Sequence, residues 1–193
     1  MKLAIVDVGC GNIGSVAIAF ERFGLSPLVS GDAETIASAD KVVLPGVGAA
    51  GYAMRQIEAR GLNGPLRALK QPVLGICLGM QLLFERSEED GTECLGIVAG
   101  SVRKLRPEPG MPVPHMGWSR LTVNDDRLGL ESGDYVYFAH SFACDPGPQT
   151  AATAEYGREV PAIVRSGNWL GAQFHPERSG AAGARFLRAF LGS

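Results

Sequence analysis

Short apolar runs alternate with segments of helical spacing along the first half of the chain. The apolar runs are rich in β-branched residues and have the length of buried strands; they lie at residues 3–8, 27–30, 40–44 and 73–76. Between and after them, apolar residues recur at helical spacing in residues 15–23 and 52–60, and more briefly in 65–69 and 80–85. This order predicts an α/β fold with a mostly parallel twisted sheet and helices on both faces.

The second half of the chain has a different pattern, with many short extended runs separated by glycine, proline and asparagine. Residues 106–114 contain four prolines, which excludes a helix or a central strand there. Closely spaced strands of this kind favour antiparallel pairing at one flank of the sheet. We expect strands at residues 98–105, 115–123, 133–143, 151–156, 162–165 and 169–174, and a closing helix at 181–191.

Composition narrows the class of protein. A chain of 193 residues can bury a substantial core, and we expect one domain over residues 1–193. A net charge of −2 gives no basic excess that would indicate a nucleic-acid partner, and there is no apolar run of membrane-spanning length. The first residues read as a strand and not as a signal peptide, so a cytoplasmic protein is expected.

The four cysteines show no paired spacing such as C-x-x-C, which argues against a zinc site and a disulfide framework. We therefore expect no metal and no cofactor. Cys77 stands apart because Gly75-Ile76-Cys77-Leu78-Gly79 joins a strand to a helix in the form of a nucleophile elbow. Helix N–H groups aimed at this point would lower the pKa of a thiol. The alternative is a buried structural cysteine beside a turn.

A nucleophilic cysteine needs a base, and the chain has three histidines, His115, His140 and His175. His175 follows a predicted strand and precedes Pro176 and Glu177. In extended chain, residues two apart point the same way, so the Glu177 carboxylate could hold the His175 imidazole. Alone, this tripeptide is typical of a surface ion pair; together with the cysteine elbow it predicts a catalytic triad.

A glycine-rich segment near the start offers a different interpretation. Gly9-Cys10-Gly11-Asn12-Ile13-Gly14 matches G-x-G-x-x-G between a strand and a helix, and Asp32 stands where a ribose-binding acid would be expected. A dinucleotide-binding module is therefore an alternative, as is a simple glycine turn. Two further loops, glycine-rich 45–51 and acidic 87–91, are by themselves typical of a turn and of a solvated surface.

Taken together, residues 75–81 and 173–177 resemble the triad glutamine amidotransferases, which hydrolyse glutamine and pass ammonia to a synthase. Within that family, the segments at 11–16, 45–48, 114–118 and 137–142 are similar to the glutaminase subunits of imidazole glycerol phosphate synthase, in histidine biosynthesis. The resemblance spans nearly the whole chain. It implies glutamine as substrate, and as partner a (β/α)₈-barrel cyclase that uses the ammonia to form imidazole glycerol phosphate and aminoimidazole carboxamide ribonucleotide.

The resemblance also implies roles for individual residues. It makes Cys77 the nucleophile, His175 the general acid and base, and Glu177 the group that orients His175. It gives the oxyanion hole to the amides of Leu78 and, after a loop rearrangement, Gly48. Residues implied to hold glutamine are Gln81, His140, Ser141 and Phe142; those implied near the partner are Asn12, Trp118, and Tyr137 or Phe138.

The chain departs from the family pattern at two places, with Ser119 where asparagine is common and Phe142 where tyrosine is common. These departures put the hydrogen bonds at both places in doubt. Alternatives of the same chemistry are glutaminase subunits that serve an anthranilate or a pyridoxal phosphate synthase. A γ-glutamyl hydrolase or cysteine peptidase would also use an elbow cysteine and a histidine.

Overall fold

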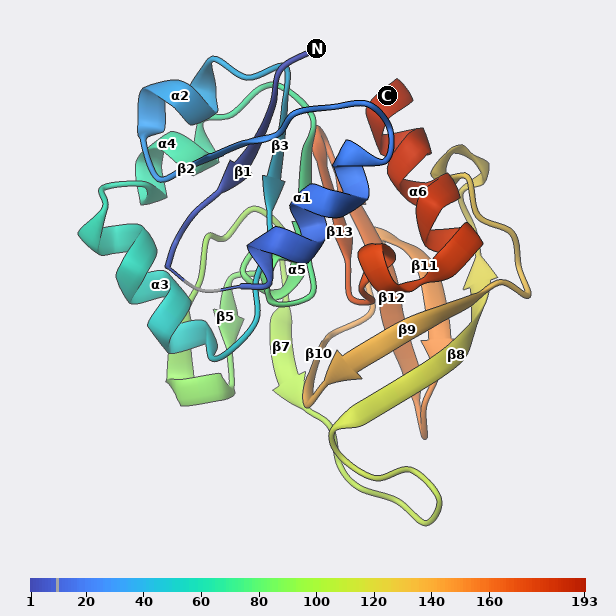
Figure 1. Cartoon of the computed structure of the whole chain (residues 1–193). Coiled ribbons are helices and arrows are strands. Elements are labelled where there is room, and N and C mark those ends of the chain that lie inside the picture. The colour runs from blue at the N-terminus through green and yellow to red at the C-terminus, as the bar shows by residue number, and fades with distance from the viewer. Residues whose placement is uncertain (10) are drawn as a thin grey trace.

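The computed structural model describes residues 1–9 and 11–193. One large sheet runs through the middle of the molecule (Figure 1). The sheet has nine strands in the order β2-β1-β3-β4-β13-β12-β11-β8-β9. Five neighbours pair in parallel: β2 (Leu28–Ser30), β1 (Leu3–Val6), β3 (Lys41–Leu44), β4 (Val73–Ile76) and β13 (Trp169–Ala172). The antiparallel flank consists of β12 (Glu159–Ser166), β11 (Thr150–Glu155), β8 (His115–Val123) and β9 (Tyr135–His140). The predicted sheet is confirmed in both parts.

Helices cover both faces of this sheet, as the sequence predicts. Along β1, Leu3 and Ile5 join the apolar cluster that contains residues of α1 (Ile13–Glu21) and α6 (Gly180–Gly192). The alternate residues Ala4 and Val6 join the cluster on the other face, because successive side chains of a strand point to opposite faces. That second face packs against α2 (Ala33–Ala37), α3 (Ala50–Ala59), α4 (Asn63–Arg67) and α5 (Leu78–Gln81).

A second, four-stranded sheet was not expected from the sequence. It contains β10 (Phe142–Cys144), β7 (Ser101–Lys104), β5 (Arg86–Ser87) and β6 (Thr92–Glu93), in that order. The segment predicted as one strand at 133–143 is divided, since β9 ends at His140 and β10 begins at Phe142 in the other sheet. The chain therefore turns at Ser141, between the two sheets.

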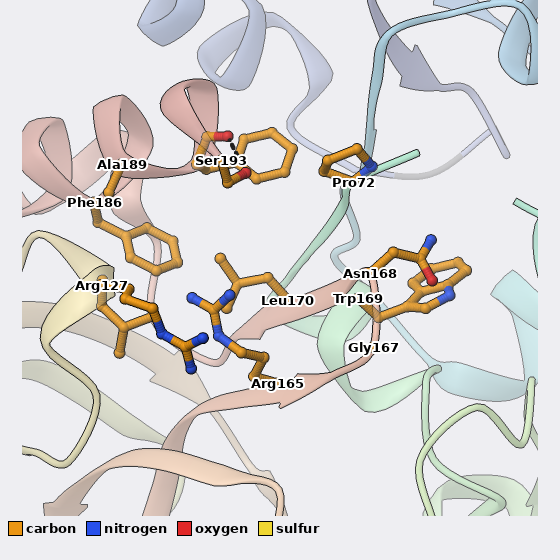
Figure 2. A pocket seen from close by; sticks show the side chains of 12 residues that line it. Pro72, Arg127, Arg165, Gly167, Asn168, Trp169, Leu170, Phe186, Ala189 and Ser193 are labelled. Carbon is orange, nitrogen blue, oxygen red and sulfur yellow. Dashed lines mark hydrogen bonds between the residues drawn. The ribbon is translucent and has the colours of Figure 1, made fainter. Parts of the chain in front are cut away.

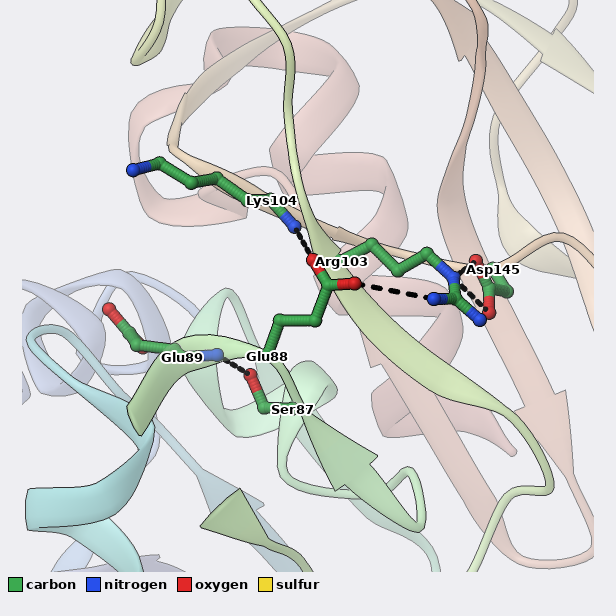
Figure 3. Close-up of polar contacts among 6 residues, drawn as sticks. All are labelled: Ser87, Glu88, Glu89, Arg103, Lys104 and Asp145. Carbon is green, nitrogen blue, oxygen red and sulfur yellow. Dashed lines mark hydrogen bonds and ion pairs between the residues drawn. The ribbon is translucent and has the colours of Figure 1, made fainter. Parts of the chain in front are cut away.

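The acidic loop after β5 is only partly the solvated surface that the sequence predicts, because two of its carboxylates make specific contacts. Figure 3 shows Glu88 against β7, where its carboxylate pairs with Arg103 at 3.3 Å and accepts from the Lys104 backbone N–H at 2.9 Å. Arg103 also pairs with Asp145 at 2.9 Å. The neighbouring Glu89 points away from this network. Its carboxylate instead accepts from the N–H of Ala50, the first residue of α3, at 2.8 Å.

Two local predictions are wrong. The helix predicted over 80–85 is the shorter α5, which starts at Leu78 and ends at Gln81. The short helix α2 was missed, and Asp32, considered as a ribose-binding acid, is its N-cap and accepts from the Thr35 N–H at 2.8 Å. Asp32 thus accepts a hydrogen bond from a backbone N–H at the start of a helix, a usual role of aspartate.

The dinucleotide interpretation of residues 9–14 also loses its structural basis. The third glycine of that motif serves close packing of helix on strand, yet a Cβ at Gly14 would meet no atom within 4 Å. The space over Gly9 is filled by the guanidinium of Arg60, 3.1 Å from where a Cβ would stand. Cys10 lies outside the described residues. Within residues 1–9 and 11–193, no helix has both the length and the apolar character that a membrane crossing requires.

Candidate active site

The elbow at Cys77 is a sharp, strained turn between β4 and α5. Cys77 has φ 54° and ψ −110°, a region that non-glycine residues rarely adopt. A Cβ on Gly75 would stand 2.6 Å from the carbonyl oxygen of Gly79, and one on Gly79 would stand 1.9 Å from that of Leu44. The prediction that side chains at both glycines would collide is confirmed. The turn holds the cysteine at the carboxyl end of the parallel strands.

His175 lies beside Cys77 because β13 is the parallel neighbour of β4. Ala172 pairs with Ile76 in register, and the Cys77 N–H donates to the Ala172 carbonyl at 2.7 Å. Both strands end at the same edge of the sheet, so the residues that follow them meet there. The Cys77 sulfur lies close enough to the His175 imidazole to raise the pKa of that imidazole. Two residues separated by nearly a hundred positions in sequence thereby come into contact.

Glu177 holds the imidazole from the other side. His175 Nδ1 lies 2.8 Å from Glu177 Oε1, and the two side chains are 9% and 2% exposed. The geometric reason predicted for this contact is wrong, because Pro176–Arg178 forms a 3₁₀ turn and not an extended segment. The turn itself brings the carboxylate back to the ring. Oε2 of Glu177 is buried without a hydrogen-bond partner among the described residues.

The charge balance at this site favours a protonated imidazole. Burial opposes the charge on His175, but hydrogen bonds and opposite charges from Cys77 and Glu177 outweigh it and raise the pKa of His175 to about 10. The His175 imidazolium lies between the Cys77 sulfur and the Glu177 carboxylate. The site can therefore offer a proton donor at neutral pH beside a cysteine, a residue type that serves as a nucleophile.

A cavity of about 360 Å³ opens on Cys77. Both residues predicted for the oxyanion hole, Gly48 and Leu78, line it. Leu78 is the first residue of α5, so its N–H has no partner within the helix. The remaining wall comes from the glycine-rich loop, the β8 start and the turn between the sheets: Val47, Gln81, Glu89, Pro114, Met116, Ala139, His140, Ser141 and Phe142.

The Gly48 loop is packed closely against the elbow at one end and is open at the other. A Cβ on Gly46 would stand 2.8 Å from the Gly79 nitrogen. Gly48 has φ +99°, a region that favours glycine, and a Cβ there would meet nothing within 4 Å. The loop is therefore anchored at Gly46, while space around Gly48 leaves room for its peptide to turn.

The Gln81 side chain is oriented by two hydrogen bonds behind the cavity. Its Nε2 donates to the Phe142 carbonyl at 2.8 Å and to Gln173 Oε1 at 3.0 Å. Gln173 Nε2 in turn donates to the Cys77 sulfur at 3.8 Å. Since both protons of Nε2 are used, the Gln81 group left for a ligand in the cavity is its amide oxygen.

Glu89 is a cavity residue that the sequence did not reveal. Glu89 lines the cavity, its carboxylate accepts from the start of α3, and burial raises the pKa of Glu89. Its surroundings in sequence, Ser87-Glu88-Glu89-Asp90-Gly91, carry no signal that separates it from its exposed neighbours. The cavity therefore contains a carboxylate able to bind a cationic group.

The residues predicted near a partner are only partly at the surface. Trp118 is 54% exposed and its ring lies edge-on to Tyr137, which is itself covered by the Arg178 guanidinium at 4.8 Å. Asn12 is exposed at the start of α1 and shares a depression with Arg178 and Glu177. Phe138, in contrast, is fully buried, so its assignment to the partner surface is wrong.

A separate cavity of about 120 Å³ lies at the opposite end of the strands (Figure 2). Pro72 and Asn168, which precede β4 and β13, line it together with Arg127 and Arg165. Those two guanidinium groups share the carboxylate of Asp125. No predicted site residue reaches this cavity. In the described part of the chain, no cluster of three His, Cys, Asp or Glu side chains could hold a metal ion.

Comparison with known proteins agrees with this geometry. Residues 4–192 match the family model of class-I glutamine amidotransferases. The chain is 49% identical over 195 residues to imidazole glycerol phosphate synthase subunit HisH of Escherichia coli K12, covering 99% of both chains. It is 48% identical over 192 residues to subunit HisH of Idiomarina loihiensis, covering 99% of this chain and 97% of the relative.

Solved structures share the fold at lower identity. A crystal structure of a glutamine amidotransferase superposes with a TM-score of 0.79 at 18% identity, covering all of this chain and 98% of the other. The structure of PurLQS from Thermotoga maritima gives a TM-score of 0.74 at 21% identity, covering 99% and 97%. The arrangement of sheet and helices is therefore that of the class-I amidotransferases.

Proposed function

Because the chain belongs to the class-I glutamine amidotransferases, as a HisH glutaminase subunit of imidazole glycerol phosphate synthase, we propose that Cys77, His175 and Glu177 perform its reaction. The observation that carries this assignment is the convergence of the three side chains beside a cavity that opens on Cys77. The His175 imidazole contacts the Glu177 carboxylate on one side and lies close to the Cys77 sulfur.

In the proposed reaction, the Cys77 thiolate adds to the side-chain carboxamide carbon of glutamine. The tetrahedral oxyanion then collapses, the C–N bond breaks, and His175 gives its proton to the nitrogen that leaves as ammonia. Water next attacks the glutamyl thioester while His175 takes its proton, and glutamate and the free cysteine are released. Proton transfer of this kind typically contributes about 10²- to 10⁴-fold to a rate.

The oxyanion would be held by the N–H groups of Leu78 and Gly48. Leu78 lines the cavity, and its N–H has no partner within the helix. Gly48 would reach its position when its peptide turns, which the open space at this glycine permits. One such donor is worth about 3 kcal/mol, so a turn of the Gly48 peptide could change the rate by about two orders of magnitude.

The amino-acid end of glutamine would lie between Gln81 and Glu89. The amide oxygen of Gln81 and the carboxylate of Glu89 are both acceptors, which suits the α-ammonium group. The turn His140-Ser141-Phe142 forms the wall beside them. This arrangement selects a substrate with a free ammonium group over one whose nitrogen is in a peptide bond.

We propose a (β/α)₈-barrel cyclase as the second subunit, which would take up the ammonia to form imidazole glycerol phosphate and the aminoimidazole carboxamide ribonucleotide. The names of the relatives support a partner because each is one subunit of the synthase. Exposed Trp118, with Tyr137 and Asn12 nearby, is the surface we assign to it. A cytoplasmic location is part of this proposal, supported by three cysteines that are free thiols.

Glutamine hydrolysis measured with and without the cyclase subunit, loaded with its ribonucleotide substrate, tests this function. We expect slow turnover by the free chain and a rate about two orders of magnitude higher in the complex, if the partner turns the Gly48 peptide. Equal rates would refute the coupling through Gly48. No turnover of glutamine in either state would refute the glutaminase assignment itself.

A further inference from the structure

Two buried histidines form a hydrogen-bonded pair beside the cavity, and the proposed reaction uses neither as acid or base. Nδ1 of His115 on β8 lies 3.0 Å from Nε2 of His140 on β9. The residues are 2% and 5% exposed. Burial lowers the pKa of each to about 4. Both rings are therefore neutral near neutral pH, and each carries one N–H proton.

The partners of this pair leave one arrangement of the protons. Nδ1 of His140 lies 2.7 Å from the Phe142 carbonyl oxygen, which can only accept, so His140 donates there. Its Nε2 must then accept, and Nδ1 of His115 must donate to it. His115 Nε2 is left as an acceptor, and the Ser119 hydroxyl, 2.9 Å away, donates to it. The chain of hydrogen bonds runs in one direction from Ser119 to Phe142.

Packing also holds the His115 ring in place. The ring is stacked between Phe138 and Tyr156, with centroids 4.7 Å and 3.8 Å away and interplanar angles of 18° and 16°. Tyr156 is itself anchored, because its hydroxyl donates to the Pro112 carbonyl at 2.6 Å. The Ser119 hydroxyl therefore adds a hydrogen bond to a ring that packing holds and whose tautomer is set through His140.

The chain ends on the carbonyl that orients Gln81. Phe142 O accepts both from His140 Nδ1 and from Gln81 Nε2. Gln81 Nε2 also donates to Gln173, which leaves the Gln81 oxygen for the cavity. The direction in which Gln81 presents its amide thus depends on where the Phe142 carbonyl points.

We propose that Ser119 and His115 are positioning residues for glutamine, acting through His140 and the Phe142 carbonyl on Gln81. This inference rests on the proposed function, since it concerns how that site holds its substrate. Without the Ser119 hydroxyl, the buried Nε2 of His115 loses its hydrogen-bond donor. That end of the His115 ring is then no longer held by a hydrogen bond. This weakens the contact of His115 with His140 and, through the Phe142 carbonyl, the support of Gln81.

Steady-state glutaminase kinetics of the complex with its cyclase test the proposal. Ser119→Ala should raise KM for glutamine about five- to tenfold, the effect of one hydrogen bond, with kcat nearly unchanged. Ser119→Thr keeps the hydroxyl and should restore the wild-type KM. Thr122→Ala, which removes an exposed hydroxyl from the same strand, is the matched control and should behave as wild type.

Imidazole ¹⁵N NMR of the same variants gives a readout that a general loss of packing would not imitate. Wild type and Ser119→Thr should both show the Nδ1–H tautomer at His115 and at His140. Ser119→Ala should keep Nδ1–H at His115 and shift its unprotonated Nε2 to the resonance of a nitrogen that accepts no hydrogen bond.

If wild type shows no glutamine turnover, the proposed function fails, and the positioning role with it. If wild type is active but Ser119→Ala matches Thr122→Ala in KM, the positioning role alone is overturned. An Nε2–H tautomer at His115 in wild type would overturn it as well.

Discussion

Gly79 packs so closely against Leu44 that a Cβ on Gly79 would stand 1.9 Å from the Leu44 carbonyl oxygen. This contact joins the first turn of α5 to the end of β3. In the sheet, β4 and β13 lie between β3 and the antiparallel flank. The helix can begin directly above the sheet edge because glycine leaves room there. Leu78, the first residue of the helix, thereby lines the cavity that opens on Cys77.

Replacement of Gly79 should therefore disrupt the elbow. Gly79→Ala should reduce the free energy of unfolding by about 3 kcal/mol or more, since backbone atoms are in the way and cannot yield. Gly64→Ala is the matched control, because Gly64 lies in helix α4 with no atom within 4 Å of a Cβ. It should be neutral or stabilise by up to about 1 kcal/mol. Urea unfolding measures both; equal effects would contradict the packing argument.

Glu177→Gln should lower kcat for glutamine about 10²-fold or more with little change in KM. The amide keeps the shape of the carboxylate but removes the charge that, with Cys77, raises the pKa of His175. The imidazolium is then less stable, and proton donation to the leaving ammonia suffers. Kinetics on the complex measure this effect. A variant with unchanged kcat would exclude Glu177 from the reaction.

Glu89→Gln should raise KM for glutamine by about tenfold, because a charge-assisted contact to the α-ammonium group is lost. Glu88→Gln is the matched control: Glu88 is the neighbouring residue, half-exposed, and pairs with Arg103 away from the cavity (Figure 3). It should leave KM unchanged. The same increase in both variants would mean that Glu89 acts through general charge and not by contact.

Stability should be greatest near pH 6.5. His115 and His140 have folded pKa values of about 4, below the ordinary 6.5, so their contribution is lost as pH falls from about 6.5 to about 4. His175 has a raised pKa of about 10, so its contribution is present below about 6.5 and lost as pH rises toward 10. Each proton that one of these histidines binds or releases on unfolding changes the free energy of unfolding by about 1.4 kcal/mol per pH unit.

Urea unfolding across this pH range measures the fall in stability on both sides of pH 6.5. His175→Asn should reduce the fall at alkaline pH and leave the fall at acid pH unchanged. A stability that is constant from about pH 4.5 to about pH 8.5 would contradict these pKa directions.

The sequence predicted the parallel strands and the elbow well because their signals are local. Residues 73–76 form an apolar run, and Gly75 and Gly79 flank Cys77 at positions where any side chain collides. The resemblance to a known family then related Cys77 to His175 and Glu177, whose meeting depends on β13 pairing beside β4. That neighbour relation is a property of the sheet order, which no local pattern contains.

What the sequence missed depends on contacts between distant segments. Glu89 reads like its neighbour Glu88, and the difference arises from the start of α3 packing over the loop. Phe138 and Tyr137 are both aromatic, but strand alternation buries the first against His115 and turns the second toward Arg178. The departure at Ser119 put a hydrogen bond in doubt, and the structure gives Ser119 one with His115.

We propose that the Cys77 sulfur begins the chemistry that releases ammonia from glutamine. The Cys77→Ala variant in complex with the cyclase tests this step when synthesis is assayed with glutamine and, separately, with ammonium salts. Glutamine should no longer support synthesis, while ammonia should support it at the wild-type rate. Synthesis from glutamine by the Cys77→Ala complex would exclude Cys77 as the nucleophile.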